Sequence, residues 1–386
     1  MNPMFDFSAL PPHLQRSLSA SLQKTITTPT IICSQDQIAA NLHSLLQQLE
    51  FPASDVYFPV KVNHTPEVIA CLNQLGTNFE IASLGELSIL ETLKISAQRI
   101  IFSNPIKIPS HICAAYHYGI RDFAFDTETE LEKIAIHAPQ SSIFARLSIS
   151  NLGAEWALND KFGIPQTEVV RLMKKAKELN LNPSGIAFHV GWNNKNPETY
   201  SNAIGIVSEL LEELSRNDIH LKFLNIGGGF PAHNCDSYVL LEAIAHKIKP
   251  QLDALQKQYG IRIIAEPGSF LLANAAAMVC KVVEVIQREN KRWIFLDSGI
   301  CQGFQWVMSQ ISYAVIYPYH IPKETSFQHY IITGPTCDSH DVFAENVHLP
   351  DTIKSGNFML VFPAGAYISS AQHYNGFDYP ETLVIG

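Results

Sequence analysis

The chain contains seven cysteines, but no two of them stand close together in the sequence. No two stand in a Cys-x-x-Cys spacing, and the odd number leaves at least one outside any disulfide. This pattern argues against a disulfide framework and against a zinc site, so we expect no bound metal. It is typical of a reducing compartment, and we therefore expect a cytoplasmic protein.

Long apolar runs and an excess of basic charge are also missing. No stretch is long enough to span a bilayer, and Met1–Asp6 lacks the basic and apolar regions of a signal peptide. The formal net charge of −9 argues against nucleic acid as a partner. With 46% hydrophobic and 16% charged residues, the 386-residue chain is expected to be a well-packed globule that binds neither nucleic acid nor membrane.

From about residue 30 to residue 270, short apolar runs alternate with amphipathic stretches typical of helices. Val56–Val60, for example, precedes a helical pattern over Pro66–Leu75, and Phe123–Phe125 precedes one over Thr127–Ile136. About eight such units without a long linker predict a TIM-like (β/α)8 barrel rather than an open doubly wound sheet.

The pattern changes after Glu266-Pro267-Gly268. Apolar segments such as Met278–Ile286 and Tyr330–Thr333 are then spaced by turns, without regular helices, which is typical of a mainly β domain, either a barrel or a sandwich. We expect the barrel to cover residues 36–270 and the mainly β domain to combine residues 1–35 and 271–386. No flexible linker separates the two domains.

Lys61 is a lone lysine in the apolar run Tyr57–Val62, which is rich in β-branched residues. Burial in such a run favours the neutral amine, the form that a Schiff-base lysine needs. The alternative is a lysine at a strand end whose stem packs while its charge reaches water.

Three further motifs follow apolar strands. His189 could stack on a flat cofactor or be a hydrogen-bonded core histidine. Gly227–Gly229 could turn backbone N–H groups toward a phosphate or simply form a tight turn. Glu266 could pair with a protonated ring nitrogen or stand in an exposed turn.

The loop Gly334–Ser339 places Cys337 beside Asp338, which supplies a proton donor and a carboxylate together. Alternatively, Cys337 is a buried apolar thiol and Asp338 forms an Asx-turn. Tyr367, near the end of the chain, could be an ordinary core tyrosine.

Taken in order, these segments resemble the fold-type III pyridoxal-phosphate decarboxylases, the ornithine/lysine/diaminopimelate decarboxylase family, from about Thr28 to Phe377. The Cys337-Asp338 loop looks most like the ornithine/lysine branch. The resemblance implies an alanine racemase/ornithine decarboxylase-like fold, pyridoxal 5'-phosphate as the cofactor, and a homodimer with shared active sites.

The resemblance also implies roles for individual residues. Lys61 would carry the Schiff base, Glu266 would keep the pyridine nitrogen protonated, and Cys337 would manage protonation after carbon dioxide leaves. Cys337 and Asp338 would reach into the partner subunit's site, where Asp338 and Asp297 would bind the substrate's distal ammonium. The implied cofactor-binding residues are Lys61, Glu80, Arg146, His189, Gly227, Gly228, Gly229, Glu266, Ser269 and Tyr367.

Three positions depart from the family pattern. Trp192 stands where the family usually has Ser, Ser269 where it usually has Arg, and Glu80 where ornithine decarboxylases commonly have Asp. The first two positions normally serve the cofactor phosphate, and a lost charge-assisted hydrogen bond is worth about 1.5–3 kcal/mol. We therefore expect a phosphate site that relies on backbone amides, or a pocket reshaped for another substrate.

The resemblance implies a pyridoxal-phosphate-dependent decarboxylase that converts ornithine or lysine into a polyamine-type amine. One alternative is a decarboxylase of an amino-acid conjugate, such as carboxynorspermidine or a siderophore precursor, for which Trp192-Asn193-Asn194 would supply aromatic and amide contacts. Another is a catalytically inactive regulatory homologue, as antizyme inhibitors are. The presence of Lys61, Glu266 and Cys337 argues against the inactive homologue.

Overall fold

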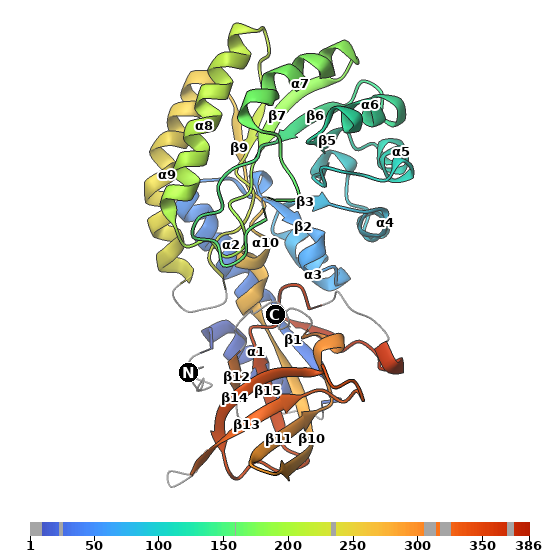
Figure 1. Ribbon diagram of the computed structural model, residues 1–386, viewed down its shortest axis with the longest axis vertical. Coiled ribbons are helices and arrows are strands. Elements are labelled where there is room, and N and C mark those ends of the chain that lie inside the picture. Colours follow the sequence, from blue (N-terminus) through green and yellow to red (C-terminus); the bar gives the residue numbers. More distant parts are fainter. Residues whose placement is uncertain are drawn as a thin grey trace. The chain divides into compact units, whose positions relative to one another are not determined.

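The computed structural model describes residues 10–22, 26–158, 160–232, 237–304, 314–316, 326–368 and 374–386. Its contacts group the chain into two compact units, one of Leu42–Ala232 with Asp236–Phe270 and the other mainly of Met1–Asn41 with Leu271–Gly386. The boundaries expected from the sequence, a barrel over residues 36–270 and a mainly β domain over residues 1–35 and 271–386, stay a prediction. Among the described residues, no helix is long and apolar enough to cross a membrane. Figure 1 labels the elements of both units.

The first unit is a parallel barrel, as predicted. Its strands pair in chain order from β2 to β9. The ring closes where Val56 bridges Ala265 and the Tyr57 N–H donates to the Ala265 carbonyl at 2.8 Å. The strands are β2 (Tyr57–Pro59), β3 (Asn78–Ile81), β4 (Ile100–Phe102), β5 (Asp122–Phe125), β6 (Ser142–Arg146), β7 (Asn182–Ala187), β8 (Phe223–Asn225) and β9 (Arg262–Ile264).

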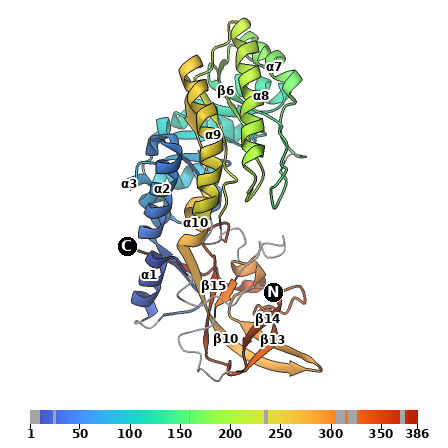
Figure 2. The same ribbon diagram turned by 90° about the vertical axis from the view of Figure 1, so that its left-hand side faces the viewer.

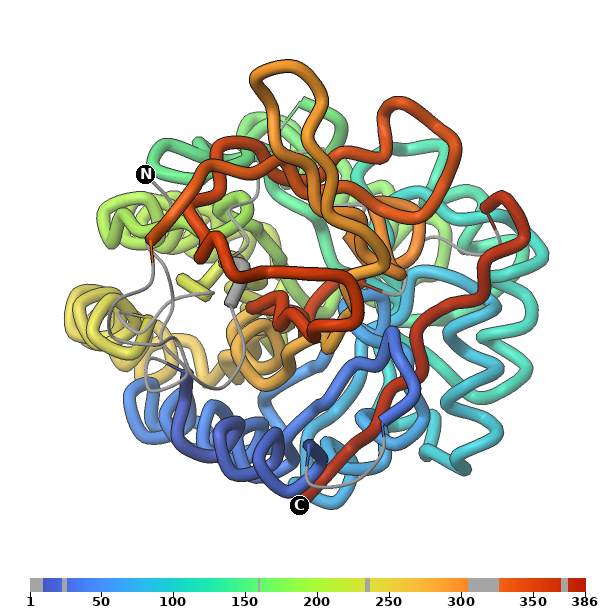
Figure 3. The backbone as a smooth tube through the Cα atoms, turned by 90° about the horizontal axis from the view of Figure 1, so that it is seen from below, coloured from blue at the N-terminus to red at the C-terminus, as the bar shows by residue number. Residues whose placement is uncertain are grey.

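Helices surround this barrel. In Figure 3 they form a ring that runs from blue through green to yellow, and Figures 1 and 2 show α8 and α9 side by side. The α-helices of this part of the chain are α2 (Gln35–Leu49), α3 (Pro66–Gln74), α4 (Leu84–Thr92), α5 (Pro109–Tyr118), α6 (Glu128–His137), α7 (Gln166–Glu178), α8 (Pro197–Arg216), α9 (Ser237–Tyr259) and α10 (Gly268–Leu272). Short 3-10 helices are η2 (Ala53–Asp55), η3 (Val60–Val62) and η4 (Ala97–Arg99).

Apolar side chains from the strands hold the barrel together. One buried cluster takes a residue from each of six strands, and the half-buried Phe223 packs against it; the members are Tyr57, Ile101, Ala124, Phe144, Ala187 and Ile264. A Cβ atom at Gly185 would lie 2.6 Å from the Phe223 ring, so only glycine leaves room for that ring. The strands are thereby fixed in register, which places their carboxyl ends at one edge.

The second unit is built on a mixed sheet, which confirms the expected mainly β domain. Its strand order is β12-β15-β10-β11-β13-β14, and β1 pairs antiparallel with β10 and parallel with β16. The strands are β1 (Thr30–Ser34), β10 (Ala276–Arg288), β11 (Lys291–Leu296), β12 (Ala314–Ile316), β13 (Phe327–Thr333), β14 (Val342–Pro350), β15 (Phe358–Phe362) and β16 (Glu381–Ile385). It also contains the 3-10 helices η5 (Ala273–Ala275), η6 (Ile300–Gln302) and η8 (Tyr374–Gly376).

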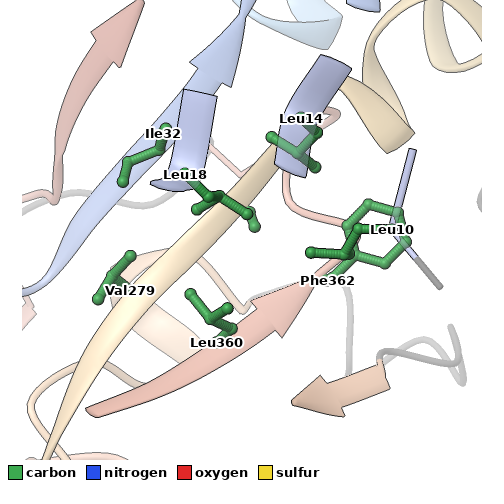
Figure 4. Packing of buried hydrophobic residues seen from close by; sticks show 8 residues of the cluster. Leu10, Leu14, Leu18, Ile32, Val279, Leu360 and Phe362 are labelled. Atoms are coloured by element: carbon green, nitrogen blue, oxygen red, sulfur yellow. The ribbon is translucent and has the colours of Figure 1, made fainter. Parts of the chain in front are cut away.

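An N-terminal helix, α1 (Pro12–Leu22), was not expected in this unit. Leu14 and Leu18 lie four residues apart and therefore share one face of the helix. With Leu10, they pack onto a buried cluster of strand residues that Figure 4 shows: Ile32, Ala277, Val279, Leu360 and Phe362. The helix thus covers one apolar face of the sheet.

Candidate functional site

Lys61 lies directly after β2, in η3, between two fully buried valines. Its own side chain is 45% exposed, which agrees with the alternative of a lysine whose charge reaches water and not with burial of the amine. The Lys61 amine lies 3.0 Å from Oε2 of Glu80, a β3 residue whose side chain is only 1% exposed. Burial raises the pKa of Glu80 to about 7, and the nearby positive charge of Lys61 opposes that rise. The amine therefore has both access to solvent and a carboxyl neighbour that can hold a proton near neutral pH.

The second oxygen of the Glu80 carboxyl, Oε1, is buried and finds no hydrogen-bond donor among the described residues. A buried polar atom left without a partner costs about 1–3 kcal/mol. Such an atom beside an accessible amine indicates a place where a bound group supplies the missing partner.

Arg146 and His189 come from neighbouring strands, since Arg146 ends β6 and His189 follows β7. The Gly191 N–H donates to His189 Nδ1 at 3.1 Å, which leaves Nε2 to carry the ring proton. Burial lowers the pKa of His189 well below its usual value, and the Arg146 charge adds to this, so the ring is neutral. Burial likewise lowers the pKa of Arg146, although the Glu266 carboxylate opposes that change. The Arg146 guanidinium makes no hydrogen bond or ion pair with any described residue, so it can take an anion.

The glycine run Gly227–Gly229 follows β8. A Cβ atom at Gly227 would lie 2.2 Å from the Phe188 carbonyl oxygen, and one at Gly228 would lie 2.4 Å from the Glu266 carbonyl oxygen. Glycine is therefore required here because neighbouring backbone approaches closely, which agrees with the alternative of a tight turn. The Gly227 N–H donates to Asn225, whereas no acceptor within the described ranges is recorded for the N–H groups of Gly228 and Gly229. Those two amides can face an anion, so the binding of a phosphate by the glycine run stays a prediction.

Glu266 follows β9 and is 7% exposed. Its Oε1 accepts hydrogen bonds from Ser103 Oγ and Asn225 Nδ2, both at 2.6 Å. Sequence reasoning missed Ser103 and Asn225, although both are polar residues at the carboxyl ends of barrel strands, where functional groups gather. Two donors from different strands hold the Glu266 carboxyl in one orientation.

Trp192 and Ser269, the two departures from the family pattern, contact each other. The Trp192 indole Nε1 donates to Ser269 Oγ at 3.3 Å. The backbone of Trp192 also forms an antiparallel bridge with Trp156, whose carbonyl accepts from the Trp192 N–H at 2.9 Å. The indole is therefore anchored where it meets the start of α10.

Cys337 and Asp338 lie in the second unit, in the loop between β13 and β14. The Cys337 thiol is exposed, so the alternative of a buried thiol is wrong. Asp338 Oδ1 accepts from the His340 N–H at 2.9 Å, which is the Asx-turn considered above, and lies 3.1 Å from His340 Nδ1. Asp338 Oδ2 accepts from the Tyr374 hydroxyl at 2.6 Å. Hydrogen bonds from Tyr374 and His340 lower the pKa of Asp338 to about 2, so the carboxylate is charged at neutral pH.

Asp297 and Tyr367 belong to the same unit as Asp338. The Asp297 carboxylate accepts from the Lys281 N–H at 2.8 Å, within the β10–β11 pair. Burial raises the pKa of Asp297, and a hydrogen bond from Thr28 opposes the rise. Asp297 is thus engaged with strand backbone, whereas Asp338 stands in a loop. Tyr367 has a φ of +59°, a backbone conformation that is uncommon for residues other than glycine. The surrounding structure must therefore hold the turn after Gly365 in this conformation.

Comparison with known proteins places this site in a family. Residues 35–273 match the model of the pyridoxal-dependent decarboxylases, described as their pyridoxal binding domain. The lysine/ornithine decarboxylase of Selenomonas ruminantium is 32% identical over 366 residues, which are 94% of this chain and 91% of that protein.

The chain belongs to the pyridoxal-dependent decarboxylase family.

Two solved structures extend the likeness over nearly the whole chain. The lysine/ornithine decarboxylase of Vibrio vulnificus, complexed with cadaverine, has a TM-score of 0.87 at 28% identity and covers 98% of this chain and 100% of its own. The arginine decarboxylase of Paramecium bursaria Chlorella virus, bound to agmatine, has a TM-score of 0.88 at 25% identity and covers 95% and 100%. The predicted family, fold, enzyme class and cofactor are confirmed.

The residues of this decarboxylase fit pyridoxal 5'-phosphate. An accessible amine at Lys61 suits the cofactor's carbonyl carbon, and the oriented Glu266 carboxyl suits its ring nitrogen. The available amides of Gly228 and Gly229 suit its phosphate. The barrel therefore provides amine, carboxyl and anion-binding groups from the carboxyl ends of different strands.

Proposed function

We propose that this decarboxylase acts on lysine or ornithine and releases carbon dioxide and the corresponding diamine. The observation that carries the proposal is the accessible Lys61 amine, 3.0 Å from a buried Glu80 whose other oxygen is unsatisfied among the described residues. The names of the relatives support a basic substrate, since lysine/ornithine decarboxylases align with almost the entire chain.

The barrel residues divide the work between them. Lys61 would hold the cofactor covalently, and Glu80 would hold or release the proton that the amine exchanges. Glu266 would keep the pyridine nitrogen protonated, because Ser103 and Asn225 fix its carboxyl. The neutral His189 ring would stack on the cofactor, and pyridoxal phosphate, when bound, supplies the electron sink for the charge left by carbon dioxide.

The phosphate would be held by Gly227, Gly228 and Gly229, with Arg146, Ser269 and Tyr367 nearby. The amides of Gly228 and Gly229, which have no acceptor among the described residues, support this assignment. Trp192 already donates to Ser269 Oγ, so that hydroxyl is held in place by the indole.

A homodimer with shared sites is part of the proposal. In it, Cys337 and Asp338 complete the partner's site, with Cys337 delivering a proton to the substrate carbon and Asp338 binding the distal ammonium. The exposed thiol and the charged, loop-borne carboxylate support these roles. Asp297 is the weaker candidate for the ammonium, because its carboxylate already accepts from strand backbone. A cytoplasmic location is also proposed, and the described cysteines form no disulfide with one another.

A direct test combines chemistry with a substrate panel. Borohydride reduction of the yellow, cofactor-loaded protein, followed by peptide mapping, should place the phosphopyridoxyl group on Lys61. Carbon dioxide release should then be highest with lysine or ornithine. Turnover of an amino-acid conjugate alone would replace the proposed substrate, and a protein that binds no cofactor would favour the inactive regulatory homologue.

Subunit mixing tests the shared site. Lys61→Ala and Cys337→Ala proteins should each be inactive, but random reassociation makes half of the dimers mixed, each with one intact site out of two. Mixing should therefore restore about a quarter of the parent activity. Failure to recover activity after demonstrated subunit exchange would contradict shared sites.

A further inference from the structure

The loop that carries Asp338 is held by a second, buried aspartate. Asp341 is 3% exposed, and its carboxylate accepts from the Ile300 N–H at 2.9 Å and from the Thr336 N–H and hydroxyl at 3.1 and 2.6 Å. A Cβ atom at Gly334 would lie 2.4 Å from that carboxylate, so the chain closes tightly around it. The backbone on both sides of Asp338 is therefore held by the buried Asp341 carboxylate.

The acceptor positions of Asp338 can be counted. An ionised carboxylate offers about four lone-pair positions, two on each oxygen. Oδ1 receives the His340 N–H and faces His340 Nδ1, which must carry a proton because a carboxylate only accepts. Oδ2 receives the Tyr374 hydroxyl. Counting the described residues alone, Oδ1 is filled and Oδ2 keeps one position.

We propose that His340 sets the substrate preference of this decarboxylase by filling Oδ1 of Asp338, which leaves a site for an ammonium and not for a guanidinium. The inference rests on the proposed function, in which Asp338 receives the distal cation of the substrate. An ammonium needs a single acceptor for one of its N–H groups, and Oδ2 provides it. A guanidinium binds a carboxylate best through two parallel N–H groups, one to each oxygen, and here Oδ1 cannot take the second.

The fold itself does not make this choice. The solved structures of a relative complexed with cadaverine and of another bound to agmatine match the chain with TM-scores of 0.87 and 0.88. A diamine and a guanidinium ligand are therefore compatible with the same backbone. Discrimination has to come from side chains, and His340 and Tyr374 are those that the structure places on the proposed cation acceptor.

Two substitutions on the same carboxylate separate this proposal from a general disturbance. His340→Ala removes the ring donor and keeps the backbone N–H, so it opens a position on Oδ1. Tyr374→Phe also removes one donor, but it opens a position on Oδ2 only. The His340 side chain is 84% exposed, so its removal takes no packing from the fold. His246→Ala and Tyr259→Phe, at residues on α9, are matched controls.

The test measures kcat/KM for lysine and arginine and, by calorimetry on the cofactor-loaded enzyme, the affinities for cadaverine and agmatine. His340→Ala should shift both ratios toward the guanidinium compound by about fivefold, the effect of one hydrogen bond. Tyr374→Phe and the controls should leave the ratios within about twofold. Unchanged ratios in His340→Ala, or an equal shift in Tyr374→Phe, overturn the inference while leaving the proposed function standing. If the parent releases carbon dioxide from no basic amino acid and binds neither amine, both fall.

Discussion

Two lysine–glutamate pairs of the barrel share a buried glutamate and differ in construction. Lys61 and Glu80 lie 3.0 Å apart, and Lys107 and Glu130 lie 2.8 Å apart. Both glutamates are 1% exposed, but Lys61 is 45% exposed while Lys107 is fully buried. Lys107 also donates to the Asn104 and Ala124 carbonyls, and a second lysine, Lys133, contacts Glu130.

The difference separates a structural pair from a functional one. Every donor that Lys107 brings into the interior meets an acceptor of the fold, which is how a buried charge is made tolerable. Glu130 Oε2 also accepts no hydrogen bond among the described residues, but the Lys133 amine lies 2.5 Å from it. The Lys61 pair is left incomplete among the described residues, because Glu80 Oε1 has neither a hydrogen-bond donor nor an ion-pair partner there and the amine reaches solvent. Incomplete pairing in a buried place costs stability, and such cost is typical of sites that bind another group.

Removing the amine of the incomplete pair should have the largest effect. Lys61→Ala should lower kcat by about a thousandfold or more, since the proposed covalent attachment point is lost. Unfolding of the cofactor-free protein should cost at most about 1–3 kcal/mol less, because the buried Glu80 Oε2 loses the Lys61 donor. The measurements are single-turnover decarboxylation and thermal unfolding. A variant that keeps its activity, or that unfolds much earlier, would show that the two pairs are of one kind.

The complete pair should respond in the opposite way. Lys107→Met leaves Glu130 with the Lys133 amine and the backbone N–H of residue 107, and breaking a buried pair costs about 3 kcal/mol of unfolding free energy. Decarboxylation per folded molecule should stay near the parent value. Denaturant unfolding and active-site titration check this, with Lys133→Met, whose side chain is 24% exposed, as the milder control.

The pH dependence of stability should identify the incomplete pair. Burial raises the pKa of Glu80 from 4.5 to about 7, so the folded protein binds a proton that the unfolded chain releases. That stabilisation is complete below about pH 4.5 and is lost as the pH rises through 7. Glu80→Gln should remove the decline in the cofactor-free protein, by at most about 3 kcal/mol.

Unfolding free energies measured from pH 5 to pH 8 test this expectation. Glu91→Gln, at an exposed position on α4, serves as the control and should keep the parent slope. Equal slopes in the parent and in Glu80→Gln would mean that the Glu80 carboxyl does not take up a proton on folding.

Local patterns in the sequence were enough for the barrel and for residues at its strand ends. His189 and Glu266 each follow the last residue of a strand by two positions, and alternation of strand and helix brings such strand ends to one edge. For Lys61 the apolar run left burial and exposure both open, and the turn of η3 decides for exposure, because it directs the side chain away from the two buried valines beside it. The contact of Tyr374 with Asp338 joins residues 36 positions apart, and no short-range pattern encodes it.

The smallest expected effect concerns the proposed phosphate-binding residues. A positive charge added at position 269 tests whether they can accept one. Ser269→Arg alone should change cofactor affinity little, because the Trp192 indole already contacts position 269. Trp192→Ser combined with Ser269→Arg removes the indole and should tighten cofactor binding about tenfold, as expected for a hydrogen bond to a charged group.

Titration of the cofactor-free protein, followed by absorbance, measures this affinity without relying on activity. Trp192→Ser alone is the matched control, since it opens the space without adding a charge. If Ser269→Arg binds more tightly with Trp192 in place, the indole does not restrict that position. If the double variant binds no better than the control, backbone amides such as those of Gly228 and Gly229 already satisfy the phosphate, and this decarboxylase holds its cofactor without a guanidinium at position 269.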